Sequence, residues 1–243
     1  MNRRAELDTV FQGFHNSNLE QARMRLEKGK TYQDLTTVWV TPIAKEPAMV
    51  PAKVVFQSWM NLMMPMNQQV FRLPISGHEV GEAYNMAIEM ILDNPMLSKA
   101  KYVLTVEWDN LPPPDGLLKL YESIDKYDVV GGLYWTKGEC GQPMIYGDPK
   151  VMPKNYIPQI PRIEEIQECN GLGMGFTLFR LGMFRKLKKP WFKTLQEYTP
   201  QDGARAATQD LYFFQNAQKE GYRFASDNRV RVGHLDVQTG EVW

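Results

Sequence analysis

The sequence has few cysteines and no excess of charge of either sign. Its 243 residues include only two cysteines, Cys140 and Cys169, and its 28 basic residues balance 28 acidic ones. Two cysteines do not indicate a disulfide framework, and free thiols suit a reducing compartment. A general nucleic-acid-binding protein usually carries a basic excess. The charge balance therefore does not indicate a nucleic-acid-binding protein, although a net charge does not reveal a local basic patch.

Long apolar runs are also missing. No run approaches the roughly 20 apolar residues that a membrane-spanning helix needs, and residues 1–9 lack the apolar core of a signal peptide. We therefore expect a cytoplasmic protein without a transmembrane segment, which leaves open that a single loop docks on a membrane. Hydrophobic residues still make up 43% of the chain, which is enough for a sizeable core.

Strand and helix patterns alternate along most of the chain. Residues 1–33 are polar and predict a helical extension or tail, followed by one domain at 34–243. The alternation predicts an α/β fold with a mostly parallel central sheet and helices on both faces. The expected strands are 37–41, 70–75, 102–106, 129–134, 174–179, 224 and 229–232, and the expected helices are 51–64, 80–94, 116–124, 181–187 and 208–219.

Three stretches carry more specific signals. Ser76 to Glu79 fits a capping box, in which the serine hydroxyl and the glutamate carboxylate satisfy free amides at a helix start. Gly221 fits the position that follows a helix C-terminus. Residues 135–168 and 189–207 lack a regular pattern, and a long irregular stretch inside a compact domain is usually functional or mobile.

Two acids follow the most apolar predicted strand. Ligands of open parallel sheets bind beyond the carboxyl ends of the strands, where Glu107 and Asp109 lie. Residues two apart on an extended strand point the same way, so both carboxylates can face one cation. Mg²⁺ and Mn²⁺ prefer carboxylate and phosphate oxygens. The motif alone fits two solvated acids in a turn better than a metal site, and its place in the fold is what favours a site.

The order and spacing of these segments, from Thr37 to Leu235, resemble GT-A glycosyltransferases, especially the inverting family 2 type. Residues 38–42 resemble the opening strand whose end cradles the nucleotide base. Residues 81–88 resemble the helix that carries an Arg-Asn pair near the donor, with Tyr84 in place of the arginine. Residues 102–114 resemble the strand with the Asp-x-Asp motif, which reads Glu-Trp-Asp here.

Three later segments extend the resemblance. Residues 170–176 resemble the glycine-rich segment that lines the donor sugar, and 208–210 resemble the Glu-Asp pair at the start of the helix with the catalytic base. Gln209 replaces the first acid of that pair. Residues 232–234 resemble the late strand that ends in a metal-binding histidine. A tight turn, an acid that stabilises a helix start and a structural histidine are the alternative explanations of these three segments.

The resemblance implies a metal-dependent glycosyltransferase that moves a sugar from a nucleotide-diphosphate donor, with inversion, to an unknown acceptor. That acceptor is a glycan, a lipid-linked glycan, a protein or a modified nucleic acid. The implied cofactor is Mn²⁺ or Mg²⁺. The implied roles are the catalytic base for Asp210, metal ligation for Asp109, His234 and Glu107, donor binding for Thr41, Pro42, Ser76, Asn85, Glu107, Trp108 and Gly173, and acceptor binding for Trp135 and Trp191.

Two other functions compete with this interpretation. A nucleotidyltransferase also uses acidic strand ends and a metal, but it normally has an early glycine-rich, basic phosphate loop. Residues 42–51 contain a single basic residue, Lys45, and no glycine. A non-catalytic nucleotide-sugar-binding protein is compatible with the substitutions at Glu107, Tyr84 and Gln209. The joint presence of an acid at 109, an acid at 210 and a histidine at 234 argues against it.

Overall fold

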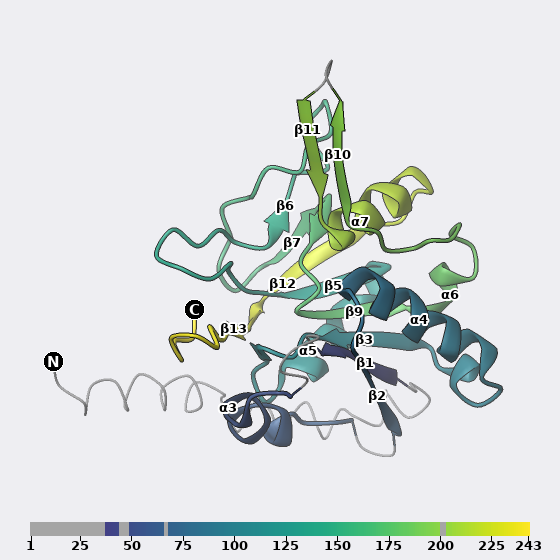
Figure 1. Ribbon diagram of the computed structural model, residues 1–243, viewed down its shortest axis with the longest axis vertical. Coiled ribbons are helices and arrows are strands. Elements are labelled where there is room, and N and C mark those ends of the chain that lie inside the picture. The colour runs from purple at the N-terminus through teal and green to yellow at the C-terminus, as the bar shows by residue number, and fades with distance from the viewer. Residues whose placement is uncertain (1–36, 44–48, 66–67, 200–202) are drawn as a thin grey trace, which may run out of the picture.

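A seven-stranded mixed sheet forms the centre of the protein, with the strand order β2-β1-β3-β9-β5-β12-β7 (Figure 1). The computed structural model describes residues 37–43, 49–65, 68–199 and 203–243. The predicted extension at 1–33 lies outside them. The strands of this sheet are β1 (Thr37–Ile43), β2 (Val70–Ser76), β3 (Tyr102–Val106), β5 (Val129–Leu133), β7 (Ile166–Cys169), β9 (Phe176–Arg180) and β12 (Phe224–Arg231).

Five of the seven strands run in one direction. Strand β1 is parallel to β2 and β3, and β12 is parallel to β5. Strand β9 is antiparallel to both β3 and β5, which gives β3 and β5 the same direction. Only β9 and β7 run the opposite way. The predicted mostly parallel sheet is confirmed, and the carboxyl ends of β1, β3, β5 and β12 share one edge.

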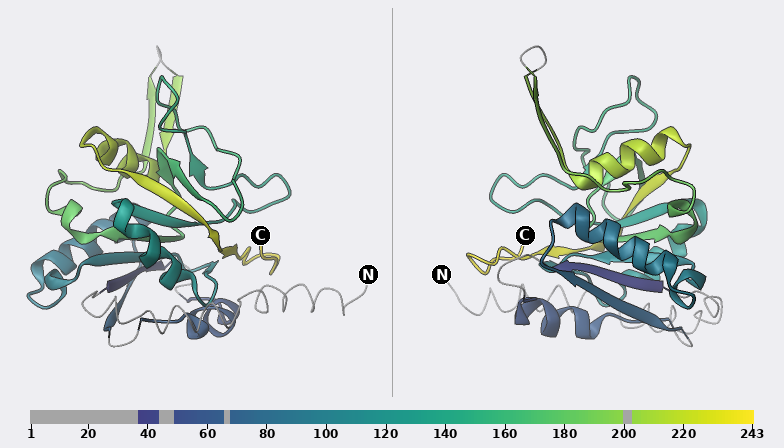
Figure 2. Two further views of the ribbon diagram at one scale, coloured as in Figure 1. Left: turned by 180° about the vertical axis from the view of Figure 1, so that it is seen from behind. Right: turned by 45° about the vertical axis from the view of Figure 1, so that its right-hand side comes forward.

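Helices cover both faces of this sheet (Figures 1 and 2). Side chains alternate along β1, so that Val38 and Val40 enter one core and Trp39 enters the other. The first core includes apolar residues of α4 and α7, and the second includes those of α5. The helices are α3 (Ala52–Gln57), α4 (Val80–Asp93), α5 (Gly116–Ser123), α6 (Leu181–Phe184) and α7 (Gln209–Lys219). Among the described helices, none is both long and apolar enough to cross a bilayer.

The start of α4 and the end of α7 test the two helix-end signals that were predicted from the sequence. The predicted capping box is wrong, because Ser76 is the last residue of β2 and Glu79 itself caps α4. The Glu79 carboxylate accepts hydrogen bonds from the amides of Gly81 at 2.8 Å and Glu82 at 3.1 Å. The signal at Gly221 is confirmed, since this glycine follows α7 with a φ of +84°, a conformation that disfavours other residues.

Several predicted boundaries differ from the structure. Strand β1 does not stop at Pro42 but continues to Ile43, because pairing with β3 ends at Val40 and a proline is tolerated where only one neighbour remains. The predicted helix at 51–64 is α3 followed by a 3₁₀ turn at Trp59–Asn61. The predicted loop at 189–207 contains a hairpin of β10 (Leu195–Thr199) and β11 (Gly203–Ala207), which rises from the sheet in Figure 1.

Besides the β10–β11 hairpin, the described residues form two short antiparallel pairs outside the main sheet. Strand β4 (Asn110–Leu111) pairs with β13 (Gly233–His234), and β6 (Ile145–Tyr146) pairs with β8 (Gly171–Leu172). The first pair directly follows the carboxyl ends of β3 and β12. It therefore joins the acidic strand end to the segment that carries His234.

Candidate functional site

A pocket of about 260 Å³ opens at the edge where β1, β3 and β12 end and where α4 and α7 begin. It gathers residues that are far apart in the chain, and five of them were predicted as site residues from the sequence. Its lining consists of Pro42, Ile43, His78, Val80, Glu107, Trp108, Asp109, Gln209 and His234.

Asp109 and His234 lie side by side in this pocket. The imidazole Nε2 of His234 is 3.6 Å from Oδ2 of Asp109. Backbone pairing fixes this distance, because His234 is in register with Asn110 and the amide of Leu235 donates to the carbonyl of Asp109 at 2.8 Å. The two side chains are therefore brought together by the sheet and do not depend on a flexible loop.

The orientation of the His234 ring is also fixed. Its Nδ1 is 2.8 Å from the backbone carbonyl oxygen of Trp135. A carbonyl oxygen only accepts, so Nδ1 carries the hydrogen, and in the neutral ring the lone pair is on Nε2. That lone pair faces the Asp109 carboxylate. Two electron-rich atoms in this arrangement favour a cation between them, and anchoring the far ring nitrogen is typical of metal-binding histidines.

A lysine that the sequence did not single out completes this group. Nζ of Lys137 is 2.5 Å from Oδ2 of Asp109. Burial alone would raise the pKa of Asp109, but its contacts with His234 and with the Lys137 ammonium outweigh burial and lower it. Asp109 is thus ionised at neutral pH. Lys137 lies in the irregular segment after β5, where no periodicity indicates which way a side chain points.

The donor set fits a divalent cation that is shared with a phosphate ligand. In the described part of the chain, no cluster of three or more His, Cys, Asp or Glu residues is placed to hold a metal. Asp109 and His234 alone offer one carboxylate oxygen and one imidazole nitrogen. Mg²⁺ in phosphate-transfer sites is commonly held by one or two carboxylates, with substrate phosphates supplying further oxygens.

Glu107, expected as a further ligand, does not complete such a cluster. Its Oε1 accepts a hydrogen bond from the Tyr84 hydroxyl at 3.2 Å. Burial, followed by the negative charges of Asp109 and Asp210, raises the pKa of Glu107 to about 8. Its neutral form therefore predominates at neutral pH. Tyr84 stands where the resemblance placed an arginine, and it contacts this carboxyl with a neutral donor.

Asp210 lies in the first turn of α7 and does not line the pocket. Its side chain is buried, and its Oδ1 is bonded to the Thr208 hydroxyl and to the Leu211 amide, the latter at 2.8 Å. Burial raises the pKa of Asp210, and these hydrogen bonds offset the rise in part. Its neighbour Gln209 lines the pocket. Asp210 is close enough for its charge to act on Glu107, and its role as a base stays a prediction.

Three residues expected to bind the donor lie elsewhere or are already engaged. Thr41 is buried, and its Oγ1 accepts from the Trp39 indole at 2.8 Å. Ser76 is exposed at the end of β2 and does not line the pocket. The Asn85 amide donates to the carbonyls of Gly81 and Phe192 and accepts from the amides of Trp191 and Phe192. Asn85 thus joins α4 to the segment after α6 and keeps no amide hydrogen for a ligand.

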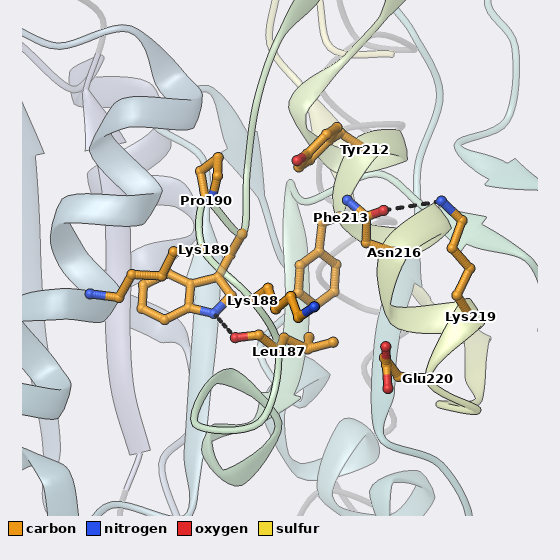
Figure 3. A pocket seen from close by; sticks show the side chains of 10 residues that line it. Leu187, Lys188, Lys189, Pro190, Tyr212, Phe213, Asn216, Lys219 and Glu220 are labelled. Atoms are coloured by element: carbon orange, nitrogen blue, oxygen red, sulfur yellow. Dashed lines mark hydrogen bonds between the residues drawn. The ribbon is translucent and has the colours of Figure 1, made fainter.

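Gly173 and the two tryptophans also take structural positions. A Cβ at Gly173 would collide with the Tyr134 hydroxyl, so this glycine allows packing against Tyr134. Trp135 supports the site through its backbone carbonyl. Trp191 is buried, and its indole donates to the carbonyl of Phe184 at 3.0 Å. It borders a separate pocket with Lys188, Lys189, Tyr212 and Lys219 (Figure 3), so the structure does not bring Trp191 to the strand-end pocket.

Known proteins are similar to this chain in structure only. No protein-family model matches the chain, and no curated protein matches it in sequence. The crystal structure of A197 from STIV has a TM-score of 0.58 at 18% identity and covers 86% of this chain and 92% of A197. GalNAc-T7, crystallised with UDP, GalNAc and Mn²⁺, has a TM-score of 0.50 at 12% identity.

The second likeness covers 83% of this chain but only 44% of GalNAc-T7, so the chain spans less than half of that protein. S. aureus TarS 1–349, solved with UDP-GlcNAc, has a TM-score of 0.42 at 11% identity and covers 81% of this chain and 58% of that one. At such identities the likeness concerns the fold. The chain has the mostly parallel, helix-covered α/β architecture of GT-A-like glycosyltransferases.

Proposed function

We propose that this protein is a metal-dependent glycosyltransferase that takes a sugar from a nucleotide-diphosphate donor. One observation carries the proposal. At the carboxyl edge of a mostly parallel sheet, Asp109 and His234 converge with the free nitrogen of the imidazole facing the carboxylate. The fold supports it, because GalNAc-T7 has a similar architecture and was crystallised with UDP, GalNAc and Mn²⁺.

Asp109 and His234 would hold Mn²⁺ or Mg²⁺ together with the donor diphosphate. When bound, such a metal neutralises charge on the departing nucleoside diphosphate. Lys137, with its ammonium 2.5 Å from Asp109, adds a second positive charge at the place where the diphosphate binds. A pocket of about 260 Å³ is smaller than most sites for whole organic ligands, which begin at about 300 Å³. We therefore assign it to the diphosphate, with the base and the sugar extending over the sheet edge.

Asp210 is the proposed general base. Its burial raises its pKa, and a carboxylate with a raised pKa is a better proton acceptor at neutral pH. It would take the proton of an acceptor hydroxyl as that oxygen attacks the anomeric carbon. A single displacement of this kind inverts the anomeric configuration. Gln209, which lines the pocket beside it, provides an uncharged amide towards the ligand.

Thermal denaturation with nucleotide sugars, with and without Mn²⁺, tests the binding part of this proposal. A ligand that binds the folded state raises the melting temperature by mass action. We expect a rise that needs both a nucleotide sugar and Mn²⁺ and that disappears in Asp109→Asn. The control is Asp93→Asn, which changes an exposed aspartate at the end of α4. A wild-type protein that no nucleotide sugar stabilises in the presence of Mn²⁺ would contradict the proposal.

Product analysis tests the chemistry. Release of a nucleoside diphosphate together with a glycosylated acceptor supports sugar transfer. Release of pyrophosphate instead would identify a nucleotidyltransferase. Stabilisation by a nucleotide sugar without sugar transfer to any acceptor or to water would identify a non-catalytic binding protein. Asp210 would then only stabilise the start of α7.

A further inference from the structure

The segment between β6 and β7, residues 147–165, has an inverted burial pattern. Its aliphatic side chains face solvent, and Ile160 is 89% exposed. Single exposed apolar residues are normal on protein surfaces, but a group of them in one segment points to an interaction site. The exposed group consists of Val151, Met152, Ile157, Ile160 and Ile163, with exposed fractions between 48% and 89%.

Polar side chains beneath the segment hold its backbone in place. The Gln167 amide donates to the Ile160 carbonyl at 3.2 Å, and the Asn228 amide donates to the Arg162 carbonyl at 2.8 Å. The Asn170 amide donates to the Asn155 carbonyl at 2.9 Å. Gln167, Asn170 and Asn228 are almost completely buried.

Backbone hydrogen bonds add to these anchors. The Gly147 amide donates to the carbonyl of Ile157, and the Gln159 amide donates to that of Ile145, both at 2.8 Å. Because both the backbone and the side chains beneath it are satisfied, the segment is not a loose loop whose isoleucines could fold back into the core. The isoleucines are held outward.

Residues 147–165 carry as many acidic as basic residues, and ion pairing with Arg231 outside the segment leaves a small positive excess at Lys150 and Lys154. Glu164 pairs with Arg231 at 3.0 Å, and Glu165 pairs with Arg162 at 2.8 Å. In the described part of the chain, no carboxylate pairs with the ammonium groups of Lys150 and Lys154. Only Asp148, which accepts the backbone amide of Lys150, opposes them. Two lysines among exposed aliphatic side chains complement a surface that is anionic outside and apolar beneath.

We propose that the β6–β7 segment docks the protein on an anionic lipid surface, with Ile157 and Ile160 entering the interface and Lys150 and Lys154 meeting the headgroups. Apolar tips beside basic residues are the composition that interfacial segments use. Figure 2 shows the segment rising from the sheet on the same side as the β10–β11 hairpin. This inference does not depend on the proposed enzymatic function.

Co-sedimentation with vesicles tests the docking. The full chain is mixed with vesicles of phosphatidylcholine alone and of phosphatidylcholine with an equal amount of phosphatidylglycerol. We expect binding to the anionic vesicles only, weakened by added salt. Ile157→Ser/Ile160→Ser should lower the partition coefficient at least about tenfold, because two buried aliphatic side chains are lost. Lys150→Glu/Lys154→Glu should lower it by a similar factor.

The matched control removes two exposed apolar side chains elsewhere. Met86 and Met90 lie on α4 with exposed fractions of 37% and 46%, and Met86→Ser/Met90→Ser should bind vesicles like the wild type. All variants should keep the wild-type melting temperature, since every changed side chain is exposed. As an opposite change, Ile160→Trp should tighten binding, because tryptophan favours the interface.

Two results would overturn the proposal. The first is a wild-type protein that binds neither kind of vesicle, which would point to a protein partner for this surface. The second is equal vesicle binding by the wild type and by the folded Ile157→Ser/Ile160→Ser variant. Neither result bears on sugar transfer, which is measured with soluble donor in the absence of vesicles.

Discussion

The strand-end pocket and the β6–β7 segment depart from ordinary burial in opposite directions. In the pocket, the ionised carboxylate of Asp109 is withdrawn from water. In the β6–β7 segment, isoleucine side chains are exposed to water. Hydrogen bonds hold both arrangements, so neither is a loosely packed region. Burial therefore guided both proposals, the metal site through a buried carboxylate and the docking surface through exposed aliphatic side chains.

The largest expected effect comes from removing the acid of the pocket. Asp109→Asn keeps the shape of the side chain and its contact with His234 but removes the negative charge that a metal needs. Metal stabilisation of a leaving group is worth several kcal/mol, and each 1.36 kcal/mol is a factor of ten in rate. We expect kcat/KM for transfer to fall by about four powers of ten. Steady-state assays across a range of Mn²⁺ concentrations measure it.

An assay of the Asp109→Asn protein at high Mn²⁺ concentration tests whether the variant has lost a metal ligand. A loss of activity that high Mn²⁺ restores fits a weakened ligand. Activity of the Asp109→Asn protein that stays within a factor of two of Asp93→Asn would remove Asp109 from the mechanism.

The next largest effect is expected at Asp210, where one substitution should change activity and stability in opposite directions. Asp210→Asn should lower kcat by about 10²–10⁴ as expected for loss of a general base, while binding of donor and Mn²⁺ is kept. The same change should raise the melting temperature at neutral pH. The amide can still accept from Thr208 and Leu211, and it avoids ionisation in a buried place.

The sign of the stability change depends on pH. The folded-state pKa of Asp210 is raised, so at low pH, below its unfolded pKa, both states are protonated and there is no penalty. As pH rises through the ordinary and then the raised value, the wild type loses stability and the asparagine variant does not. Melting curves across this window check the sign, and a gap that shrinks with rising pH would contradict it.

A moderate effect is expected where the β6–β7 segment is anchored. Gln167→Ala removes donors to Gln159 and Ile160 and the acceptor for the Arg162 amide. Unsatisfied buried groups cost about 1–3 kcal/mol, measurable as a lower free energy of unfolding in urea. Vesicle binding should weaken because the isoleucines lose their fixed positions. Gln238→Ala, at an exposed glutamine, is the control, and equal stability of the two variants would show that the anchor contributes nothing.

The smallest effect concerns Lys137, which links the pocket to the segment after β5. Its ammonium contacts the carboxylate proposed to hold the metal. Partly exposed ion pairs are worth about 0.2–1 kcal/mol, so Lys137→Met should tighten Mn²⁺ binding without donor by up to about fivefold. Isothermal titration measures this affinity. Weaker metal binding by the variant would mean that Lys137 does not compete for Asp109.

The sequence predicted the sheet better than it predicted the contacts around the site. Strand and helix periodicity reflects burial that repeats along the chain, so β3, β5 and α4 were located to within a residue or two. The pairing of Asp109 with His234 was expected from the resemblance to GT-A glycosyltransferases, which implied a shared metal. Lys137 and Tyr84 were not assigned to the site, because each contacts a residue distant in the chain. The hydrogen bonds of Asn85 were not foreseen, because nothing in the sequence shows that the segment after α6 contacts its amide.

The pairing of β4 with β13 has a consequence for the order of assembly. Asp109 follows the third strand of the main sheet in chain order, whereas His234 arrives only after β12 has been added beside β5. We expect contacts between such distant segments to form late in folding, because the loop-closure entropy of the intervening chain opposes them. A divalent ion should therefore find no partly formed site on the incomplete sheet. Its capture would report completed folding, and chelators should lower the melting temperature without preventing refolding.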